Sequence, residues 1–312
     1  MSFNLLLFLI GCIIMYFSSE NLIDHSIKIS KRFNISPIVI GATVIALGTS
    51  LPELIVSFYS IAFLESTSDS SGIIIGNILG SNIANVSLVI GYCALIYSVN
   101  LNFKVINDFI FILILGIYTI ICLHLSLTIN YIHGIILILA LIIFIYKLIK
   151  SDDLENFNDL NDDTNFLLSI TIIFLCIISL LVGSHLIVNN ATKIAEYFDI
   201  SSLTIGITII ALGTSLPELF TGVLSVKKKQ YKLFIGNIVG SNILNIVFVL
   251  GFSSLITDLK PTINQSNLFY ISLTLVTSHL ILIISYLKTK SISRFSGFLL
   301  LLLYLFFLYN II

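Results

Sequence analysis

The chain has 312 residues, of which 57% are hydrophobic and only 10% are charged, and its formal net charge at pH 7 is −1. Soluble domains carry about 25% charged residues, so this composition excludes an ordinary soluble protein. The near-neutral charge gives no sign of a nucleic-acid partner, and the four cysteines lack the spacing of a disulfide framework or a zinc site.

Ten apolar segments follow one another along the chain. Each approaches the length of about 20 residues that a helix needs to cross a bilayer. Ser36 followed by Pro37 resembles a helix N-cap with proline at the first helical position, which predicts that the second helix begins there. The sequence therefore predicts an all-α polytopic membrane protein with ten transmembrane helices, at roughly residues 3–27, 36–60, 72–97, 107–127, 131–149, 166–192, 202–226, 233–256, 267–287 and 294–312.

The basic residues predict the orientation of these helices. If the N-terminus is placed outside, only Lys193 and Lys260 of the 15 Lys and Arg residues fall in loops on the outer side. Cytoplasmic loops are the ones enriched in Lys and Arg. We therefore expect a multi-pass protein of the plasma (cell inner) membrane with both termini outside the cytoplasm.

Two stretches of the first half return in the second half. Residues 41–53 (GATVIALGTSLPE) match residues 206–218 (GITIIALGTSLPE) at eleven of thirteen positions. Residues 75–91 (IGNILGSNIANVSLVIG) match residues 235–251 (IGNIVGSNILNIVFVLG) at eleven of seventeen. Corresponding helices are five spans apart. Because five is an odd number, the second half has the opposite orientation across the membrane to the first half. Inverted repeats of this kind are typical of secondary transporters, whose binding site lies where the repeats meet.

The two halves are joined by residues 150–165, a polar and acidic stretch without glycine. A calcium-binding EF-hand loop requires a central glycine, so a solvated linker is the favoured interpretation and a weak regulatory calcium site the alternative. The predicted division is a first repeat of spans one to five at residues 1–149, the linker at 150–165, and a second repeat of spans six to ten at 166–312.

The repeated motif ALGTSLPEL (46–54 and 211–219) places polar groups inside an apolar span. Proline has no N–H, so Pro52 and Pro217 free the carbonyl oxygens of Gly48 and Gly213, four residues earlier. Within a bilayer such an oxygen is tolerated only in a cavity or with another partner, and a cation would be one. The sequence thus predicts that helices two and seven are broken at GTSLPE. A simple proline kink is the alternative, which the duplication with glutamate disfavours.

The motif also brings side-chain oxygens to one helix face. Residues at i, i+3, i+4 and i+7 share a face, which groups Ala46, Thr49, Ser50 and Glu53 in the first copy and Ala211, Thr214, Ser215 and Glu218 in the second. In the third and eighth spans the same reasoning aligns Asn77, Ser81 and Asn85, and Asn237, Ser241 and Asn245. An all-oxygen donor set suits hard cations such as Ca²⁺ and Na⁺ and disfavours zinc and copper.

Glycines in the third and eighth spans predict close helix packing. Gly76 and Gly80, and Gly236 and Gly240, form small-x-x-x-small pairs that allow another backbone to approach. Such pairs would press the polar faces against the broken helices.

Glu53 and Glu218 are the acids deep in the predicted spans, where no Lys or Arg lies beside them. A charge at the centre of a helix costs about 2.5–3.5 kcal/mol on insertion scales. Two such carboxylates require protons or mobile cations for neutralisation. A total charge of −2 balances one Ca²⁺ or partly balances two or three Na⁺.

These motifs resemble those of the cation/calcium antiporter superfamily, most closely its short prokaryotic sodium/calcium exchangers. The resemblance rests on GTSLPE at 48–53 and 213–218, GNILGSNIAN at 76–85 and GNIVGSNILN at 236–245, and it covers the whole chain. It implies four central ion sites, with Glu53 and Glu218 shared by the calcium site, and sliding of spans one and six to switch access. The ligands it implies are Ala46, Thr49, Ser50, Glu53, Ser81, Asn85, Ala211, Thr214, Ser215, Glu218, Ser241 and Asn245, with Ala and Thr acting largely through backbone carbonyls.

One position departs from part of that superfamily. The resemblance implies that potassium-dependent exchangers and close archaeal relatives have Asp at the position where this chain has Asn245. The asparagine makes the two halves symmetric, with Asn85 opposite Asn245 in the alignment of the repeats. The resemblance therefore argues against K⁺ co-transport.

The resulting hypothesis is an electrogenic Na⁺/Ca²⁺ antiporter working by alternating access, with three Na⁺ per Ca²⁺ as the resemblance implies. The alternatives are an H⁺/Ca²⁺ exchanger, because protons also neutralise carboxylates, and a passive cation channel, for which the sequence lacks the acidic rings expected at a pore mouth. No catalytic pair such as H-E-x-x-H is present, so no enzyme is predicted. We expect no cofactor, only the transported calcium and sodium ions and the lipid bilayer as partners, and a monomer to be sufficient.

Overall fold

The computed structural model describes residues 2–63, 68–125, 127–150, 166–197, 211–260 and 263–311, and these are mostly helical. Within them eight helices are long and apolar enough to cross a membrane, or nine if the segments on either side of Ser50 form one span. The seventh predicted span begins in residues 202–210, and the acidic linker covers residues 151–165; both stretches lie outside the described residues. The chain is thus an integral multi-pass membrane protein.

Contacts group the chain into two compact units. Unit 1 comprises Met1–Thr49 and Ser151–Ile238, and unit 2 comprises Ser50–Lys150 and Val239–Ile312. Each unit takes residues from both halves of the sequence, and one boundary falls inside the first GTSLPE motif. This grouping is therefore a different division from the sequence repeat.

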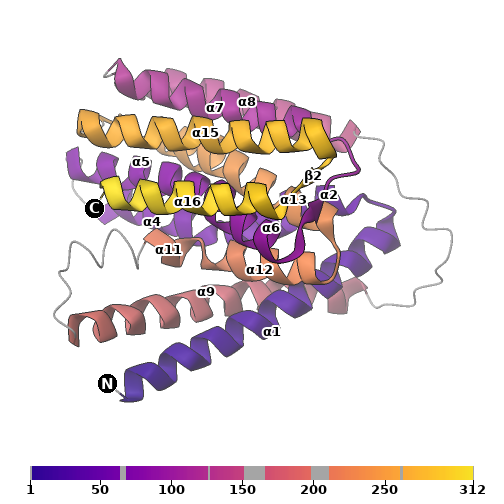
Figure 1. Ribbon diagram of the computed structural model, residues 1–312. Helices are drawn as coiled ribbons and strands as arrows, with labels where there is room; N and C mark the ends of the chain where they lie inside the picture. The colour runs from indigo at the N-terminus through magenta and orange to yellow at the C-terminus, as the bar shows by residue number, and fades with distance from the viewer. Residues whose placement is uncertain are drawn as a thin grey trace. The chain divides into compact units, whose positions relative to one another are not determined.

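Unit 1 is built on two long helices, α1 (Ser2–Phe33) and α9 (Phe166–Tyr197), which pack side by side (Figure 1). Glycines allow the close approach: a Cβ at Gly11 would lie 3.0 Å from the carbonyl oxygen of Gly183. Met15, Leu22 and Leu180 are fully buried in the core that results. The other elements of the unit are α2 (Pro37–Ile40), η1 (Gly41–Ile45), α3 (Ala46–Thr49), α11 (Ala211–Thr214), α12 (Leu216–Lys227) and the first part of α13 (Tyr231–Ile243).

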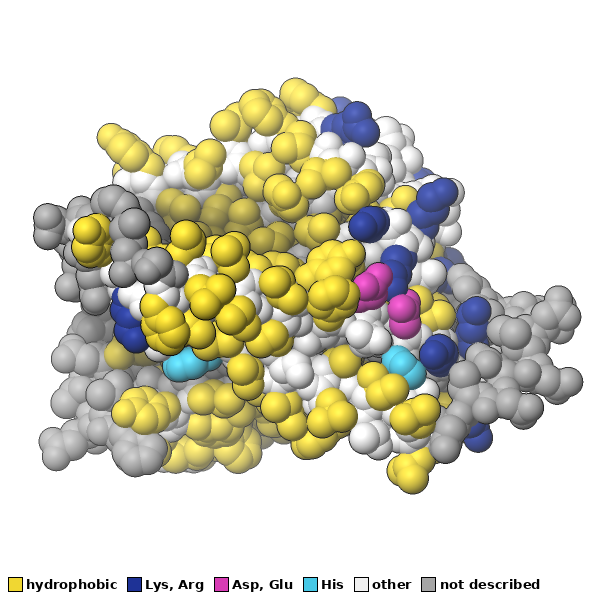
Figure 2. Space-filling model, turned by 90° about the horizontal axis from the view of Figure 1, so that it is seen from below, with side chains coloured by type: hydrophobic (Ala, Val, Ile, Leu, Met, Phe, Trp, Pro, Cys, Tyr) yellow, Lys and Arg dark blue, Asp and Glu magenta, His cyan; other side chains and the backbone are white. Residues whose placement is uncertain are grey.

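Hydrophobic side chains remain exposed on α1 and α9, including Phe3, Leu9 and Phe17 on the first helix and Leu167 and Phe174 on the second. Figure 2 shows a face of the molecule on which hydrophobic side chains predominate and a few acidic side chains lie beside basic ones. In water this surface would be unfavourable, whereas lipid tails are as apolar as the side chains themselves.

The second predicted helix begins at Pro37, as expected. Its backbone supports the turn through a bond from Val39 N–H to the Ser36 carbonyl, 2.9 Å long, whereas the Ser36 side chain makes no capping bond. The helix is interrupted at Ser50, between the end of α3 and the start of α4 (Leu51–Phe63). The second copy of the motif is interrupted at Ser215, between α11 and α12.

Unit 2 pairs helices from the two halves of the chain. α6 (Gly91–Tyr97) packs on α16 (Arg294–Ile311), α7 (Ile106–His124) on α15 (Gln265–Thr289), and α8 (Tyr131–Lys150) on α14 (Gly251–Ile256). A short antiparallel ladder joins β1 (Val99–Asn100) to β2 (Ser291–Ile292). The remaining elements are α4, α5 (Ser68–Ile83), η2 (Ala84–Ile90), η4 (Leu244–Leu250) and the last residues of α13.

Basic side chains gather at one end of unit 2. The β1–β2 ladder brings the loop that carries Lys104 next to the one that carries Lys290, since Leu101 N–H donates to the Lys290 carbonyl at 2.8 Å. Lys147 at the end of α8 pairs with Asp108 at the start of α7, 2.7 Å apart. These lysines therefore lie near one another at this end of unit 2.

The predicted close packing at Gly236 is confirmed. A Cβ at this position would overlap the carbonyl oxygen of Ile38, and one at Gly41 would lie 3.0 Å from the Asn237 nitrogen, so α13 and the segment α2–η1 meet backbone to backbone. At Gly76 and Gly80 no described atom lies within 4 Å of the position that a Cβ would occupy. The repeat counterpart of Gly41 is Gly206, which lies outside the described residues.

We predict that Gly236→Ala destabilises the protein by about 1–3 kcal/mol, because the methyl group must displace the backbone at Ile38. Gly72→Ala is the control, since no described atom lies within 4 Å and alanine favours the helix. Thermal unfolding of both purified variants in detergent measures the difference. Equal midpoints would contradict the packing at Gly236.

Candidate functional site

Two glutamates lie at the beginnings of equivalent helices. Glu53 is in the first turn of α4 and Glu218 in the first turn of α12, and each side chain is 0% exposed. They are the only buried acids among the described residues. A helix N-terminus carries partial positive charge, which favours an anionic side chain in the first turn. Each unit therefore contains one deeply buried carboxyl group.

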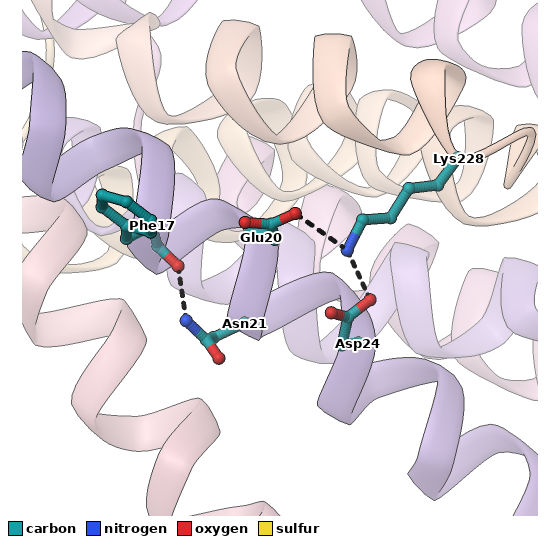
Figure 3. Close-up of polar contacts among 5 residues, drawn as sticks. All are labelled: Phe17, Glu20, Asn21, Asp24 and Lys228. Carbon is teal, nitrogen blue, oxygen red and sulfur yellow. Dashed lines mark hydrogen bonds and ion pairs between the residues drawn. The ribbon is translucent and has the colours of Figure 1, made fainter.

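The acids of α1 behave differently (Figure 3). Glu20 and Asp24 are one helical turn apart, and Lys228, just after α12, reaches both, with Nζ 3.6 Å and 2.5 Å from the two carboxylates. Both acids are at least a third exposed. Glu20 lies inside a predicted span but was not among the predicted site residues, and the structure shows its charge balanced by a lysine.

Asn237 organises the polar groups of unit 1. Its Oδ1 accepts a hydrogen bond from the Thr49 hydroxyl at 3.1 Å, and its Nδ2 donates to the Thr221 hydroxyl at 3.1 Å. Thr221 in turn donates to the Pro217 carbonyl, 2.7 Å away. One buried amide thus links the end of α3 to the first turns of α12. The Thr49 hydroxyl therefore uses its hydrogen for the bond to Asn237.

The carbonyl that Pro217 frees has a protein partner. The Ser184 hydroxyl of α9 donates to the Gly213 carbonyl oxygen at 2.8 Å, and Ser184 is buried. The freed carbonyl at Gly213 thus has a serine hydroxyl as one partner, and the suggestion that a cation binds such a carbonyl stays a prediction. Ser184 carries no signal in the repeated motifs and could be found only from the packing of α9.

The corresponding amide of unit 2 makes a different bond. Asn77 Nδ2 donates directly to the Glu53 backbone carbonyl at 3.1 Å. The repeat counterpart of Thr221 is Val56, which has no hydroxyl to stand between amide and carbonyl. Asn77 therefore binds the helix turn that contains Glu53 through one hydrogen bond. Asn237 reaches the turn that contains Glu218 through two successive hydrogen bonds, with Thr221 between them.

Four asparagines form a second network in unit 2. Asn85 Nδ2 donates to Asn242 Oδ1 at 3.0 Å, and Asn245 Nδ2 donates to Asn82 Oδ1 at 3.1 Å. Asn82 Nδ2 also donates to the Asn242 backbone carbonyl at 3.0 Å. All four side chains are 0% exposed. Asn82 and Asn242 were not among the predicted ligands, although both belong to the repeated GSNI sequence.

Asn85 and Asn245 each sit in a stretch of π-helix, η2 and η4, which begins one residue earlier. A third such stretch, η1, ends immediately before Ala46. Single turns of π-helix inside α-helices occur frequently at functional sites. The backbone thus departs from regular helix where the sequence placed candidate ligands.

The predicted ligands divide evenly between the units, six in each. Thr214 is half-buried, the side chain of Ala211 is not described, and the other ten are buried. Unit 1 holds Ala46, Thr49, Ala211, Thr214, Ser215 and Glu218, and unit 2 holds Ser50, Glu53, Ser81, Asn85, Ser241 and Asn245.

Comparison with known proteins finds relatives along nearly the whole chain. A family model described as sodium/calcium exchanger protein matches residues 3–150 and 168–312. An uncharacterized membrane protein of Methanocaldococcus jannaschii is 34% identical over 304 residues, covering 96% of this chain and 94% of its own. The sodium/calcium exchanger MaX1 of Methanosarcina acetivorans is 27% identical, covering 98% and 97%. The solved structure of the sodium-calcium exchanger NCX_Mj soaked with Na⁺ and Sr²⁺ aligns with a TM-score of 0.81 at 33% identity, covering 97% of each chain.

We predict that Ser184→Ala destabilises the protein by about 1–3 kcal/mol, because the Gly213 carbonyl is left buried without a donor. Ser19→Ala is the matched control: Ser19 occupies the repeat-equivalent position in α1, is 0% exposed, and its hydroxyl has no hydrogen-bond partner among the described residues. Thermal unfolding of the two variants decides. An equal loss in both would refute a specific role for the Ser184 bond.

Proposed function

This chain belongs to the sodium/calcium exchanger family, and we propose that it is an antiporter that moves Ca²⁺ across the membrane in exchange for Na⁺. The observation that carries the proposal is the complete burial of Glu53 and Glu218, each at a repeated GTSLPE motif. A buried carboxylate is costly unless its charge is balanced. Ca²⁺ and Na⁺ are the balancing charges that an exchanger of this family would carry.

The surrounding donors suit these ions. Carboxylate, amide, hydroxyl and carbonyl oxygens are the ligands that Ca²⁺ prefers, and oxygen ligands also suit other hard cations. The proposed ligands are the twelve residues divided between the units above. Together they contribute two negative charges, from Glu53 and Glu218, because Asn85 and Asn245 are neutral. One Ca²⁺ or several Na⁺ would compete for the same carboxylates, and this competition makes exchange obligatory.

The proposed stoichiometry of three Na⁺ for one Ca²⁺ makes transport electrogenic. A tenfold Na⁺ gradient supplies about 1.4 kcal/mol per ion. One net charge moving through 100 mV adds about 2.3 kcal/mol. Three ions and one charge therefore supply roughly 6.5 kcal/mol, sufficient for a Ca²⁺ gradient of about 10⁴-fold.

We further propose ten transmembrane helices in two inverted repeats, with helices two and seven broken at GTSLPE. The interruptions of the helices at Ser50 and Ser215 support the breaks. Access would alternate through sliding of the first and sixth spans, which correspond to α1 and α9 and pack on each other within unit 1. The basic residues support a plasma-membrane orientation with both termini outside, and nothing in this mechanism requires more than a monomer.

An H⁺/Ca²⁺ exchanger is the second candidate, because protonation neutralises buried carboxylates as effectively as sodium does. Calcium flux separates the two functions. We predict that inverted vesicles loaded with Na⁺ and diluted into Na⁺-free medium take up Ca²⁺, and that pH or K⁺ gradients of equal size do not replace the Na⁺ gradient. Uptake driven by the pH gradient alone would establish proton exchange instead.

We predict that Glu53→Gln and Glu218→Gln each abolish exchange, lowering Ca²⁺ uptake by roughly a hundredfold or more, because the neutral amide cannot balance the charge of a bound ion. Glu20→Gln is the control, since Glu20 is partly exposed and Lys228 retains Asp24 as its partner. Uptake into proteoliposomes measures the effect, and size-exclusion profiles confirm folding. Full activity in either test variant would remove that glutamate from the site.

A further inference from the structure

The four asparagines of unit 2 form two crossed pairs. Asn85 of η2 donates to Asn242 at the end of α13, and Asn245 of η4 donates to Asn82 at the end of α5. Each helix thus contributes one donor and one acceptor to the other, and the pairs join the two copies of GSNI–x–N. Because all four side chains are fully buried, no bulk water competes for these bonds.

The bonds determine which atom each amide has left over. Asn85 and Asn245 both use Nδ2, and their Oδ1 atoms have no hydrogen-bond partner among the described residues. An amide presents its oxygen and its nitrogen in different directions, so fixing the nitrogen also fixes the oxygen. Two buried acceptors without donors are unusual in a folded protein and require an explanation. A cation ligand is an explanation that fits an oxygen and excludes an N–H.

We propose that Asn82 and Asn242 are positioning residues, which hold the amides of Asn245 and Asn85 so that their oxygens, and not their N–H groups, face a transported cation. The inference rests on the proposed function, because it assumes that Asn85 and Asn245 are ion ligands. It assigns a role to two residues that carry no charge and bind no ion themselves.

Such a hydrogen bond is needed because an asparagine side chain has little intrinsic preference for one orientation of its amide group. Rotation about χ2 is broad and roughly two-fold, so an untethered amide exchanges its oxygen and nitrogen at small cost. The wrong orientation would direct a donor at a cation, and the ion would be repelled. Mutation of a residue that hydrogen-bonds to a metal ligand and orients it typically lowers metal affinity by about 10–100-fold.

The network is asymmetric, and the asymmetry supplies a conservative variant. Asn82 uses both ends of its amide, because its Nδ2 donates to the Asn242 carbonyl. Asn242 uses only Oδ1, since its Nδ2 has no partner among the described residues. Asn242→Asp therefore keeps the acceptor that Asn85 needs and removes an N–H group without a partner among the described residues. Its buried carboxyl group lowers the stability of the variant itself, so ion binding is judged by the shift of the variant's own unfolding temperature. Asn242→Leu is similar in size but removes the acceptor.

The test measures ion binding to the full purified chain, by the shift of its unfolding temperature with CaCl₂ or NaCl alone. We expect Asn242→Leu and Asn82→Leu to weaken ion binding about tenfold or more, and Asn242→Asp to stay much closer to the wild type. Asn190→Leu is the control, because Asn190 is also a buried amide, and its one hydrogen bond among the described residues is to Leu186 of its own helix. A similar loss in the control and the test variants, or an Asp variant as weak as the Leu variant, would overturn the proposal.

A crossed set of double variants identifies the path of the effect. If Asn242 acts through Asn85, Asn242→Leu adds no further loss in an Asn85→Ala background and keeps its full effect in an Asn245→Ala background. Asn82→Leu should lose most of its effect in the Asn245→Ala background, and it keeps there only the part that comes from its bond to the Asn242 carbonyl. Equal losses in both backgrounds would mean that the asparagines act through general packing, and the positioning role would be wrong.

This experiment is independent of transport. If the wild type binds Ca²⁺ but flux experiments show no Na⁺-driven uptake, the proposed exchange fails while the positioning role stands or falls on the crossed variants. If flux is as proposed and the Leu variants of Asn82 and Asn242 bind ions like the wild type, the positioning role alone is refuted.

Discussion

The burial of two carboxyl groups in an apolar protein is the constraint on which the other features depend. Glu53 and Glu218 are excluded from solvent, and an ionised carboxylate in such surroundings needs oxygen-bound cations or a proton to balance it. The helix interruptions at Ser50 and Ser215 place each glutamate in a first turn, where the helix dipole reduces this cost. Asn77 and Asn237 then fix those turns through backbone and hydroxyl groups.

Each half of the repeat solves the same problem with different bonds. Asn237 reaches the Pro217 carbonyl through Thr221, whereas Asn77 contacts the Glu53 carbonyl directly. Ser184 satisfies the carbonyl that Pro217 frees, whereas the equivalent Ser19 has no hydrogen-bond partner among the described residues. The sequence motifs are nearly identical in the two copies, and the first difference follows from Thr221 standing where the other copy has Val56, whereas Ser184 and Ser19 are the same residue type with different contacts. Symmetry of the motifs therefore does not imply symmetry of the contacts.

The family, the helical class and the burial of the glutamates could be predicted, because composition and repeated motifs determine them. The start of the helix at Pro37 and the close packing at Gly236 followed from local rules of backbone chemistry. The roles of Ser184 and of Asn82 and Asn242 could not be predicted, because they depend on which side chains meet across helices far apart in sequence. The ion pair of Lys228 with Glu20 and Asp24 was missed for the same reason.

The pairing of α1 with α9 has a consequence for biosynthesis. The first helix leaves the ribosome long before its partner, since residues 34–165 separate them. During that interval α1 carries Ser18, Ser19 and Ser26, which the finished protein buries, without the surface that covers them. During co-translational insertion the first helix therefore stays unpaired in the bilayer, or beside the insertion machinery, until α9 has been synthesised.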